Sequence, residues 1–156
     1  GQGVSVAGMN ANDVWVKLAR CCTPVPGDEI IGFITRGQGV SVHQSSCPNA
    51  IRLQGLHPER FVEVSWSGEH SQAQYLVQIQ TKALDRPGLL ADMTKVMTDY
   101  RVNILSASTV STRDQVATAR FSFELAEISH LNAVLSALRR VDGVFEAVRV
   151  STSAAQ

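Results

Sequence analysis

The stretch YLVQIQTKALDRPGLL, from Tyr75 to Leu90, joins a strand pattern to the start of a helix. Apolar residues alternate with polar ones from Tyr75 to Lys82, which is the period of a half-buried β-strand. The turn at 85–88 is followed by apolar residues at helical spacing, namely Leu89, Met93, Val96, Met97 and Tyr100. A strand that leads through a short turn into an amphipathic helix predicts the first unit of an α+β domain.

The remainder of this region completes that domain. Three further strands are predicted, at 104–111, 117–125 and 144–150. Ser129 suits the N-cap of a second helix between the last two of these strands. The order βαββαβ over residues 75–151 predicts a ferredoxin-like fold, with both helices on one face of an antiparallel sheet. Because the other face is left bare, we expect dimerisation or domain packing.

The rest of the chain divides into shorter parts. The polar and aperiodic segment 67–74 is the expected linker, and the segment 14–66 before it forms a separate module. Because the chain begins with Gly1 and not with Met, we expect it to be a fragment of a longer protein. Residues 1–13 are then a cloning scar or an interdomain segment, and residues 152–156 are a disordered tail.

The segment 14–66 predicts a small βββαβ module. Short apolar runs are separated by glycine and proline, which are turn residues. Strands are expected at 14–18, 30–35, 40–43 and 61–66, with a helix from Pro48 to about Gln54 before the last of them. Trp15 and Trp66 flank the module, and we expect them to be packing residues rather than base-stacking ones.

The three cysteines of the chain, Cys21, Cys22 and Cys47, lie in this module together with His43. Three cysteines and one histidine are a complete ligand set for a structural zinc ion, whose coordination is tetrahedral. A catalytic zinc ion needs a free position and is not expected here. Small buried thiols beside a hydrogen-bonded histidine are one alternative. A structural disulfide is least favoured, because the number of cysteines is odd and nothing indicates export.

Composition excludes several classes of protein. The chain has 156 residues, of which 44% are hydrophobic, and its acidic and basic residues balance at 14 each. No overall charge therefore favours nucleic acid or a membrane. No signal peptide and no apolar run of about 18 residues are present, so we expect a cytoplasmic protein without membrane contact. No nucleophile–base pair or open metal site is visible, so this fragment is not expected to be an enzyme.

Several motifs in both regions resemble one known family. In the first region these are KLARCCTPVPGD (17–28), TRGQGVSVH (35–43) and CPN (47–49). They resemble the conserved-cysteine module of long RelA/SpoT-type alarmone enzymes, also called the zinc-finger or ribosome-intersubunit domain. LDRPGLL (84–90) and VNI (102–104) resemble the ACT domain that follows this module in those proteins. The resemblance covers residues 14 to 150, which is nearly the whole chain.

This resemblance implies a function at the level of a longer parent. RelA/SpoT-type enzymes make and break (p)ppGpp, from GTP or GDP and ATP, in N-terminal catalytic domains. They are GTP pyrophosphokinases, (p)ppGpp hydrolases or both. Their C-terminal half senses the starved ribosome in the stringent response and controls those catalytic domains. The present chain would be the last two modules of that regulatory half.

The resemblance also implies an RNA contact in the first module. In the family this module docks against large-subunit ribosomal RNA near the A-site finger. Glycines in the turn at 37–39 would let backbone N–H groups approach phosphate oxygens. The family often has basic residues at the positions of Gln38 and Gln44, so glutamine here would lower the number of neutralised phosphates. The candidate contacts are Lys17, Arg20, Arg36, Gly37, Gln38 and Gly39; an ordinary solvated cationic face is the alternative.

The resemblance to ACT domains implies an amino-acid site in the second module, because related ACT domains bind amino acids at a homodimer interface. The helix start at Gly88 offers unpaired backbone N–H groups to a carboxylate. Asn103 would hold the amino group, and apolar neighbours suit a branched side chain such as that of valine or isoleucine. The candidate ligand residues are Asp85, Pro87, Gly88, Leu89, Leu90, Asn103 and Ile104. A plain helix-start turn at Pro87 and Gly88, without a ligand, explains the sequence equally well.

Two other functions stay open beside ribosome recognition. The chain could be an amino-acid effector sensor that works without the ribosome, or a redox switch built on Cys21 and Cys22. The switch predicts lowered thiol pKa values and no bound metal. The relative effects of charge reversal at Arg36 and of Gly88→Val on alarmone levels would separate ribosome recognition from effector sensing.

Overall fold

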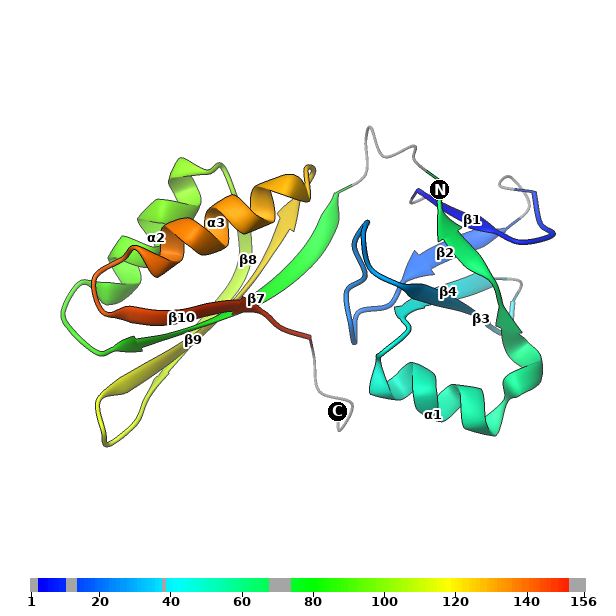
Figure 1. Cartoon of the computed structure of the whole chain (residues 1–156), viewed down its shortest axis with the longest axis horizontal. Helices are drawn as coiled ribbons and strands as arrows, with labels where there is room; N and C mark the ends of the chain where they lie inside the picture. Colours follow the sequence, from blue (N-terminus) through cyan, green and yellow to red (C-terminus); the bar gives the residue numbers. More distant parts are fainter. Residues whose placement is uncertain (1–2, 11–13, 38, 68–73, 152–156) are drawn as a thin grey trace. The chain divides into compact units, whose positions relative to one another are not determined.

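Figure 1 shows the chain as a computed structural model, which describes residues 3–10, 14–37, 39–67 and 74–151. The chain divides into two compact units, of which the first extends to Ala73 and the second from Gln74 to Val150. Gln38, most of the expected linker and the expected tail lie outside the described residues. Within the described part of the chain, no helix is long and apolar enough to cross a membrane.

The first unit contains six strands and two helical segments among its described residues. They are β1 (Val4–Val6), β2 (Trp15–Leu18), β3 (Ile30–Ile34), β4 (Gly39–Gln44), α1 (Pro48–Leu56), the 3-10 helix η1 (Pro58–Arg60), β5 (Phe61–Val62) and β6 (Val64–Trp66). Four strands form one sheet in the order β2-β4-β3-β5, and β1 pairs with β6 in a separate ladder. β2 runs parallel to β4, whereas β3 is antiparallel to β4 and to β5. The edge strand β2 therefore has only β4 beside it.

The folded module begins earlier than the sequence pattern indicates. We expected residues 1–13 to be a scar or an interdomain segment, but β1 lies within them and pairs antiparallel with β6. Val4 and Val6 are buried in one cluster with Val40 and Val42 of β4. Three residues carry too little periodicity to predict a strand, and the partner strand lies at the far end of the module.

The strand expected at 61–66 is also divided. Phe61 and Val62 pair with β3, whereas the residues after Glu63 pair with β1. The carbonyl oxygen of Glu63 accepts a hydrogen bond from the backbone N–H of Ala7 at 2.9 Å. The chain therefore changes partner strands at this residue, which local periodicity cannot reveal. The other three strands and the helix of this module lie within two residues of their expected bounds.

The second unit confirms the predicted βαββαβ order. Its elements are β7 (Tyr75–Leu84), α2 (Leu89–Asp99), β8 (Asn103–Ser111), β9 (Val116–Leu125), α3 (Ser129–Arg139) and β10 (Val144–Arg149). The sheet order is β10-β7-β9-β8, and every neighbouring pair is antiparallel. Both helices lie on the same face of this sheet (Figure 1). Ser129 is the first residue of α3 and not its cap, because Ile128 occupies the N-cap position.

The core of the second unit lies between the sheet and the two helices. In the β7–β9 register, Val77 lies opposite Phe123 and Ile79 opposite Phe121, and all four are at most 1% exposed. Both helices add fully buried side chains, among them Met97 and Leu138. Each such burial contributes about 1.5–3 kcal/mol. This unit therefore has a core of its own that does not depend on the first unit.

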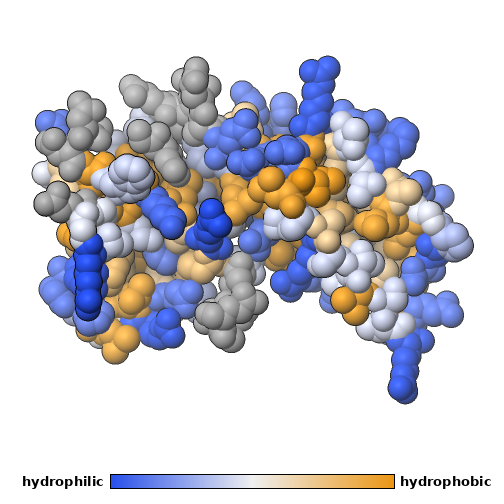
Figure 2. Space-filling model, turned by 180° about the vertical axis from the view of Figure 1, so that it is seen from behind, coloured by the Kyte–Doolittle hydropathy of each residue, from blue (hydrophilic) through white to orange (hydrophobic). Residues whose placement is uncertain are grey.

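The face of this sheet away from the helices has polar pairs at its centre, with the exposed apolar residues Leu84, Val110 and Val148 beside them. Gln80 of β7 lies opposite Arg120 of β9, and the Arg120 Nε donates a hydrogen bond to the Gln80 side-chain oxygen at 3.0 Å. Gln78 and Ser122 form the next pair on this face. Figure 2 shows hydrophilic and hydrophobic residues interspersed over the surface of the molecule in that view. The centre of this face is therefore compatible with water, whereas the apolar residues beside it leave surface that a partner could cover.

Candidate functional site

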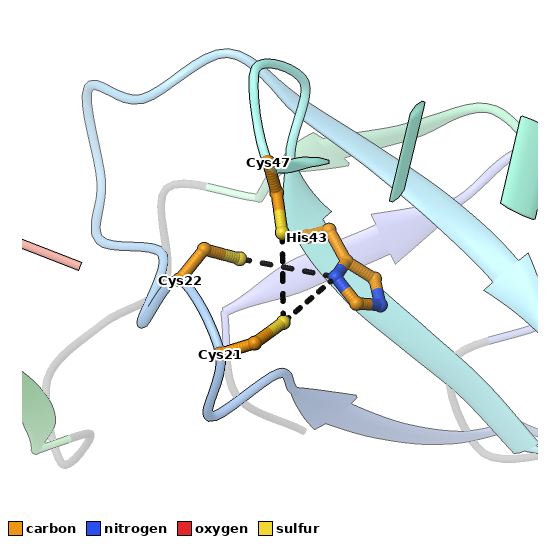
Figure 3. A group of neighbouring side chains, drawn as sticks. All are labelled: Cys21, Cys22, His43 and Cys47. Carbon is orange, nitrogen blue, oxygen red and sulfur yellow. Dashed lines mark hydrogen bonds between the residues drawn. The ribbon is translucent and has the colours of Figure 1, made fainter. Parts of the chain in front are cut away.

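The three cysteines and the histidine of the first unit converge on one point, as Figure 3 shows. Cys21 and Cys22 lie in the turn after β2, His43 belongs to β4, and Cys47 is the N-cap of α1. The four ligand atoms all lie within 4.8 Å of one another. The Cys21 sulfur is 3.4 Å from His43 Nδ1 and 3.5 Å from the Cys47 sulfur, and the Cys22 sulfur is 3.8 Å from His43 Nδ1.

A tight turn aims the two adjacent cysteines at the same point. The backbone N–H of Ala19 donates to the Val42 carbonyl at 2.8 Å, which extends the β2–β4 pairing to the edge of the turn. The N–H of Thr23 then donates back to the Ala19 carbonyl at 3.0 Å, and Thr23 has a φ of 45°. This left-handed conformation is uncommon outside glycine and costs on the order of 1 kcal/mol. The site therefore contains backbone strain where both thiols turn inward.

The distances in this cluster fit a tetrahedral zinc ion. Zinc–sulfur bonds of about 2.3 Å and zinc–nitrogen bonds of about 2.0–2.1 Å place neighbouring ligand atoms about 3.5–3.8 Å apart. The three separations above, from 3.4 to 3.8 Å, fall at these values. Cys22, His43 and Cys47 are 1%, 7% and 4% exposed and Cys21 is partly exposed, so most of the ligand set is enclosed by protein. The residues could thus hold a structural metal ion.

Ser41 is a member of the site that the sequence analysis missed. Its hydroxyl lies 3.3 Å from His43 Nε2, the ring nitrogen on the far side from the thiols. A partner on that nitrogen fixes the ring orientation and the tautomer that leaves Nδ1 available as a ligand. Ser41 and His43 are two residues apart on β4, so their side chains point to the same face of the sheet. That spacing is the sequence signal for the contact.

Burial favours the uncharged forms of the thiols and of the imidazole in this cluster, which disfavours a redox switch. It raises the pKa of the Cys21 and Cys22 thiols, and it lowers the pKa of His43. In the absence of a metal ion the thiols are therefore protonated and poorly nucleophilic. This direction is opposite to the lowered thiol pKa values that the redox-switch alternative requires at Cys21 and Cys22. A bound cation would supply the charge that stabilises thiolates in this buried place.

The described candidate RNA contacts lie along β2, just after it, and in the turn that leads into β4. Lys17 and Arg20 are exposed and line a hollow of about 360 Å³ together with Gly39. Arg36 and Gly37 are exposed in the turn between β3 and β4, and the φ of 114° at Gly37 favours glycine. Gln38 lies outside the described residues. The structure thus brings Lys17, Arg20 and Gly39 to one surface.

The two tryptophans differ in their surroundings. Trp66 is half-buried, and its Nε1 donates to the Asp28 carbonyl at 3.1 Å, as a packing residue should. Trp15 is 78% exposed, so the expectation that it packs in the module is wrong. Its side chain points away from the Val40–Val42 core because successive side chains alternate between the faces of a strand, and Val16 and Leu18 face that core. Gln44 donates its side-chain amide to Asp28 at 2.9 Å and is engaged within the module.

The Asp85–Gly88 turn of the second unit is held by side-chain contacts. The Asp85 carboxylate accepts a hydrogen bond from the Ser111 hydroxyl at 2.8 Å. Arg86 donates to the Asp142 carbonyl and pairs with Asp92 at 2.8 Å. Gly88 is the N-cap of α2 with a φ of 79°, a conformation that side chains rarely adopt. The turn is therefore a rigid helix start that leaves backbone N–H groups at its surface.

Two of the apolar candidates in this turn have different environments. Leu89 is 4% exposed and packs in the core of the unit, so it offers little surface to a ligand. Leu90 is 44% exposed on the outer side of α2. Of the two adjacent leucines, only Leu90 can contribute apolar surface to a ligand or a partner.

Asn103 and Ile104 lie at the other end of the sheet from this turn. Asn103 is opposite Glu124 of β9, and Glu124 is opposite Leu76 at the start of β7. The turn follows Leu84, eight positions further along β7, which at about 3.3 Å per residue is about 26 Å away. β7 and β8 both run antiparallel to β9, so they are parallel to each other and the two segments cannot meet. One chain by itself therefore does not assemble the predicted amino-acid site.

Comparisons with known proteins agree with this two-domain architecture. The family model of the RelA/SpoT RIS domain matches residues 4–67, and that of the ACT domain matches residues 71–149. The crystal structure of the ACT domain from the GTP pyrophosphokinase of Chlorobium tepidum aligns with 50% of this chain and 100% of its own, at 23% identity and a TM-score of 0.46. The chain is thus a RIS domain followed by an ACT domain, two regulatory modules.

Longer relatives contain the same pair of modules. The chain is 55% identical over 151 residues to a GTP pyrophosphokinase of Streptomyces coelicolor, covering 97% of this chain and 17% of that protein. It is 51% identical over 152 residues to the bifunctional (p)ppGpp synthase/hydrolase RelA of Mycobacterium tuberculosis, covering 97% and 20%. With the GTP pyrophosphokinase of Escherichia coli the identity is 42% over 137 residues, covering 87% and 18%. The chain belongs to the RelA/SpoT family, and it spans about a fifth of the length of these relatives.

Proposed function

We propose that this chain is the sensory part of a cytoplasmic (p)ppGpp synthetase/hydrolase, and that its first module, stabilised by zinc, docks on large-subunit ribosomal RNA. The observation that carries the proposal is the Cys21–Cys22–His43–Cys47 cluster at the end of β2. A metal ion held there would fix the strand that carries Lys17 and the turn that begins with Arg20. The RIS and ACT domains and the activities for which the relatives are named support the parent's identity.

Metal content tests the zinc part of this proposal. Protein purified without chelator should contain about one zinc ion per chain, as a closed four-ligand site requires. His43→Ala should lower that content, whereas Ser46→Ala, at an exposed serine beside Cys47, should not. Metal-free, folded protein whose Cys21 and Cys22 oxidise readily would support the redox switch and contradict the zinc site.

Binding to isolated large ribosomal subunits tests the RNA part. Phosphate contacts release counterions, so affinity should fall steeply with salt. Charge reversal by Arg36→Glu should weaken binding at every salt concentration. Arg113→Glu, at an exposed arginine in the β8–β9 hairpin of the other unit, is the matched control. Equal binding of wild-type protein and Arg36→Glu would contradict the proposed docking surface.

The ACT domain has a second proposed role, which is amino-acid sensing across a homodimer that acts on the parent's catalytic domains. The support is geometric: the Gly88 turn and Asn103 lie at opposite ends of one sheet, so a shared ligand needs Asn103 from a second copy. β8 has one strand neighbour and is exposed along nearly its whole length, with Leu105 53% and Val110 64% exposed. An exposed edge strand is a ready surface for pairing with another chain.

Mixing two variants tests the shared site directly. Gly88→Val should abolish the stabilisation by valine, isoleucine or leucine in a thermal-shift assay, and Asn103→Ala should do the same. A mixture of the two variants should recover part of it, because half the sites in a mixed dimer have both an intact turn and an intact asparagine. A ligand at about 100 times its dissociation constant adds about 2.7 kcal/mol to stability. No shift with any amino acid, or no dimer in sedimentation, would contradict this role.

A further inference from the structure

Trp15 is the most exposed of the large apolar side chains that the structure describes, at 78%. It lies at the start of β2, the edge strand of the four-stranded sheet, opposite Gly39 of β4. Among the described residues, its indole is not part of the cluster around Val40 and Val42, which lies on the other face of the sheet. An aromatic ring of this size, left on an edge strand, has a free face for a ligand.

The surroundings of Trp15 form a shallow site. A hollow of about 360 Å³ is lined by Trp15, Lys17, Ala19, Arg20, Thr35, Gly39, Val40 and Ser41. The glycine at position 39 is part of this shape. A Cβ there would lie 3.0 Å from the Thr35 hydroxyl and 3.3 Å from the Trp15 carbonyl oxygen, so a larger residue would fill the space beside the strand. Gly39 thus keeps the surface beside the indole open.

The charges around this hollow have one sign. Lys17 and Arg20 are both exposed, and none of the described residues that line the hollow carries a carboxylate. Asp28 and Glu29 precede β3, whose first residue Ile30 pairs with Gln44. Gln44 and Gly39 are at opposite ends of β4, about 16 Å apart. Trp15 therefore lies at the opposite end of the sheet from these two acids, whereas Arg20, which follows the Leu18–Val42 pair, lies toward their end.

We propose that Trp15 is the stacking platform for an unpaired nucleobase of RNA, with Lys17 and Arg20 on the adjoining phosphates. This inference deepens the proposed RNA docking and rests on it. Single-stranded RNA is bound by aromatic rings that stack on splayed bases, combined with cations that follow the backbone. The Trp15 indole, the two cations and the hollow that Gly39 keeps open provide this combination. The polar Thr35 and Ser41 side chains add hydrogen-bonding groups at the rim of the hollow.

Tryptophan fluorescence of the whole chain gives a direct test, with short single-stranded oligoadenylate as the probe. The chain has two tryptophans, and the half-buried Trp66 serves as an internal reference. The probe should quench the emission of wild-type protein. Trp15→Phe should keep most of the affinity but lose the quenching, because phenylalanine still stacks. Trp15→Ala should lower the affinity about 5- to 100-fold, the range for one base–aromatic stack.

The salt dependence separates the stack from the phosphate contacts. Lys17→Ala should reduce the slope of log affinity against log salt by about 1, whereas Trp15→Ala should leave that slope unchanged. Ile51→Ala, at an exposed apolar residue of α1, is the matched control and should bind like wild type. Thermal unfolding and zinc content of each variant report whether the module is still folded.

The outcomes distinguish this inference from the function on which it rests. If Lys17→Ala and Arg36→Ala weaken binding while Trp15→Ala binds like wild type, RNA docking stands and the stacking role is overturned. If none of these variants changes binding, the docking proposal fails as well. Equal quenching by a blunt RNA duplex, or by free adenosine monophosphate, would also overturn the stacking of an unpaired RNA base. Trp15 could also be buried by another part of the full-length parent. An indole that stays protected from solvent both with and without RNA would overturn the stacking role.

Discussion

Removal of the metal should unfold the first unit and leave the second unit folded. The first unit contains few fully buried apolar side chains: Val40, Val42, Val4 and Val6 form its main cluster. A unit of this length, at about 0.05–0.15 kcal/mol per residue, has a net stability of about 3–10 kcal/mol. Structural zinc contributes about 10–16 kcal/mol in comparable small modules at neutral pH. The contribution of zinc is at least as large as the whole net stability of the unit, so loss of zinc should unfold the unit.

The second unit should be unaffected because its core is independent. Phe121, Phe123, Val77 and Ile79 are at most 1% exposed within that unit. We expect calorimetry of the metal-loaded chain to show the first unit melting in a transition that chelator removes. The amide signals of residues 74–151 in a two-dimensional NMR spectrum should keep their dispersion. His43→Ala should reproduce the effect of chelator without any added reagent.

Two results would refute this reasoning. One is a first unit that keeps its dispersed amide signals after zinc has been shown to be absent. The other is a cooperative loss of both units together on chelation, which would mean that their cores are not independent. Ser46→Ala, beside Cys47 but exposed, controls for unspecific effects of substitution near the cluster.

Three further predictions follow from individual contacts. Ser41→Ala should lower zinc affinity about 10- to 100-fold in a competition assay with a chromogenic chelator, because the His43 imidazole loses its orienting partner. Unchanged zinc affinity would show that the 3.3 Å contact between Ser41 and His43 has no role. Leu138→Ala should destabilise the second unit by about 2–5 kcal/mol in urea unfolding, since Leu138 is fully buried, whereas Leu90→Ala should change stability by less than about 0.5 kcal/mol. Gly32→Ala should destabilise the first unit by about 1–3 kcal/mol, because its Cβ would lie 2.7 Å from a methyl group of Val64; wild-type thermal stability would show that the valine moves aside.

Local pattern in the sequence was enough to predict the second unit. Alternation along β7 and β9 and the helical spacing in α2 and α3 each depend on residues a few positions apart. Every strand of that sheet is long enough to show its period, so the βαββαβ order followed without any tertiary information. The convergence of Cys21, Cys22, His43 and Cys47 was also predictable, because zinc restricts ligand type and number so strongly that this set of residues stood out.

Tertiary structure decided what depends on pairing between distant segments. β1 forms because it pairs with β6, and its three residues are too few to show a strand pattern in the sequence. The separation of Asn103 from the Gly88 turn follows from strand direction in the folded sheet. Exposure of Trp15 follows from the position of β2 at a sheet edge, since the same residue on an inner strand would be covered. Residue type and spacing are local properties of the chain, whereas burial and proximity between distant residues arise only when the strands assemble.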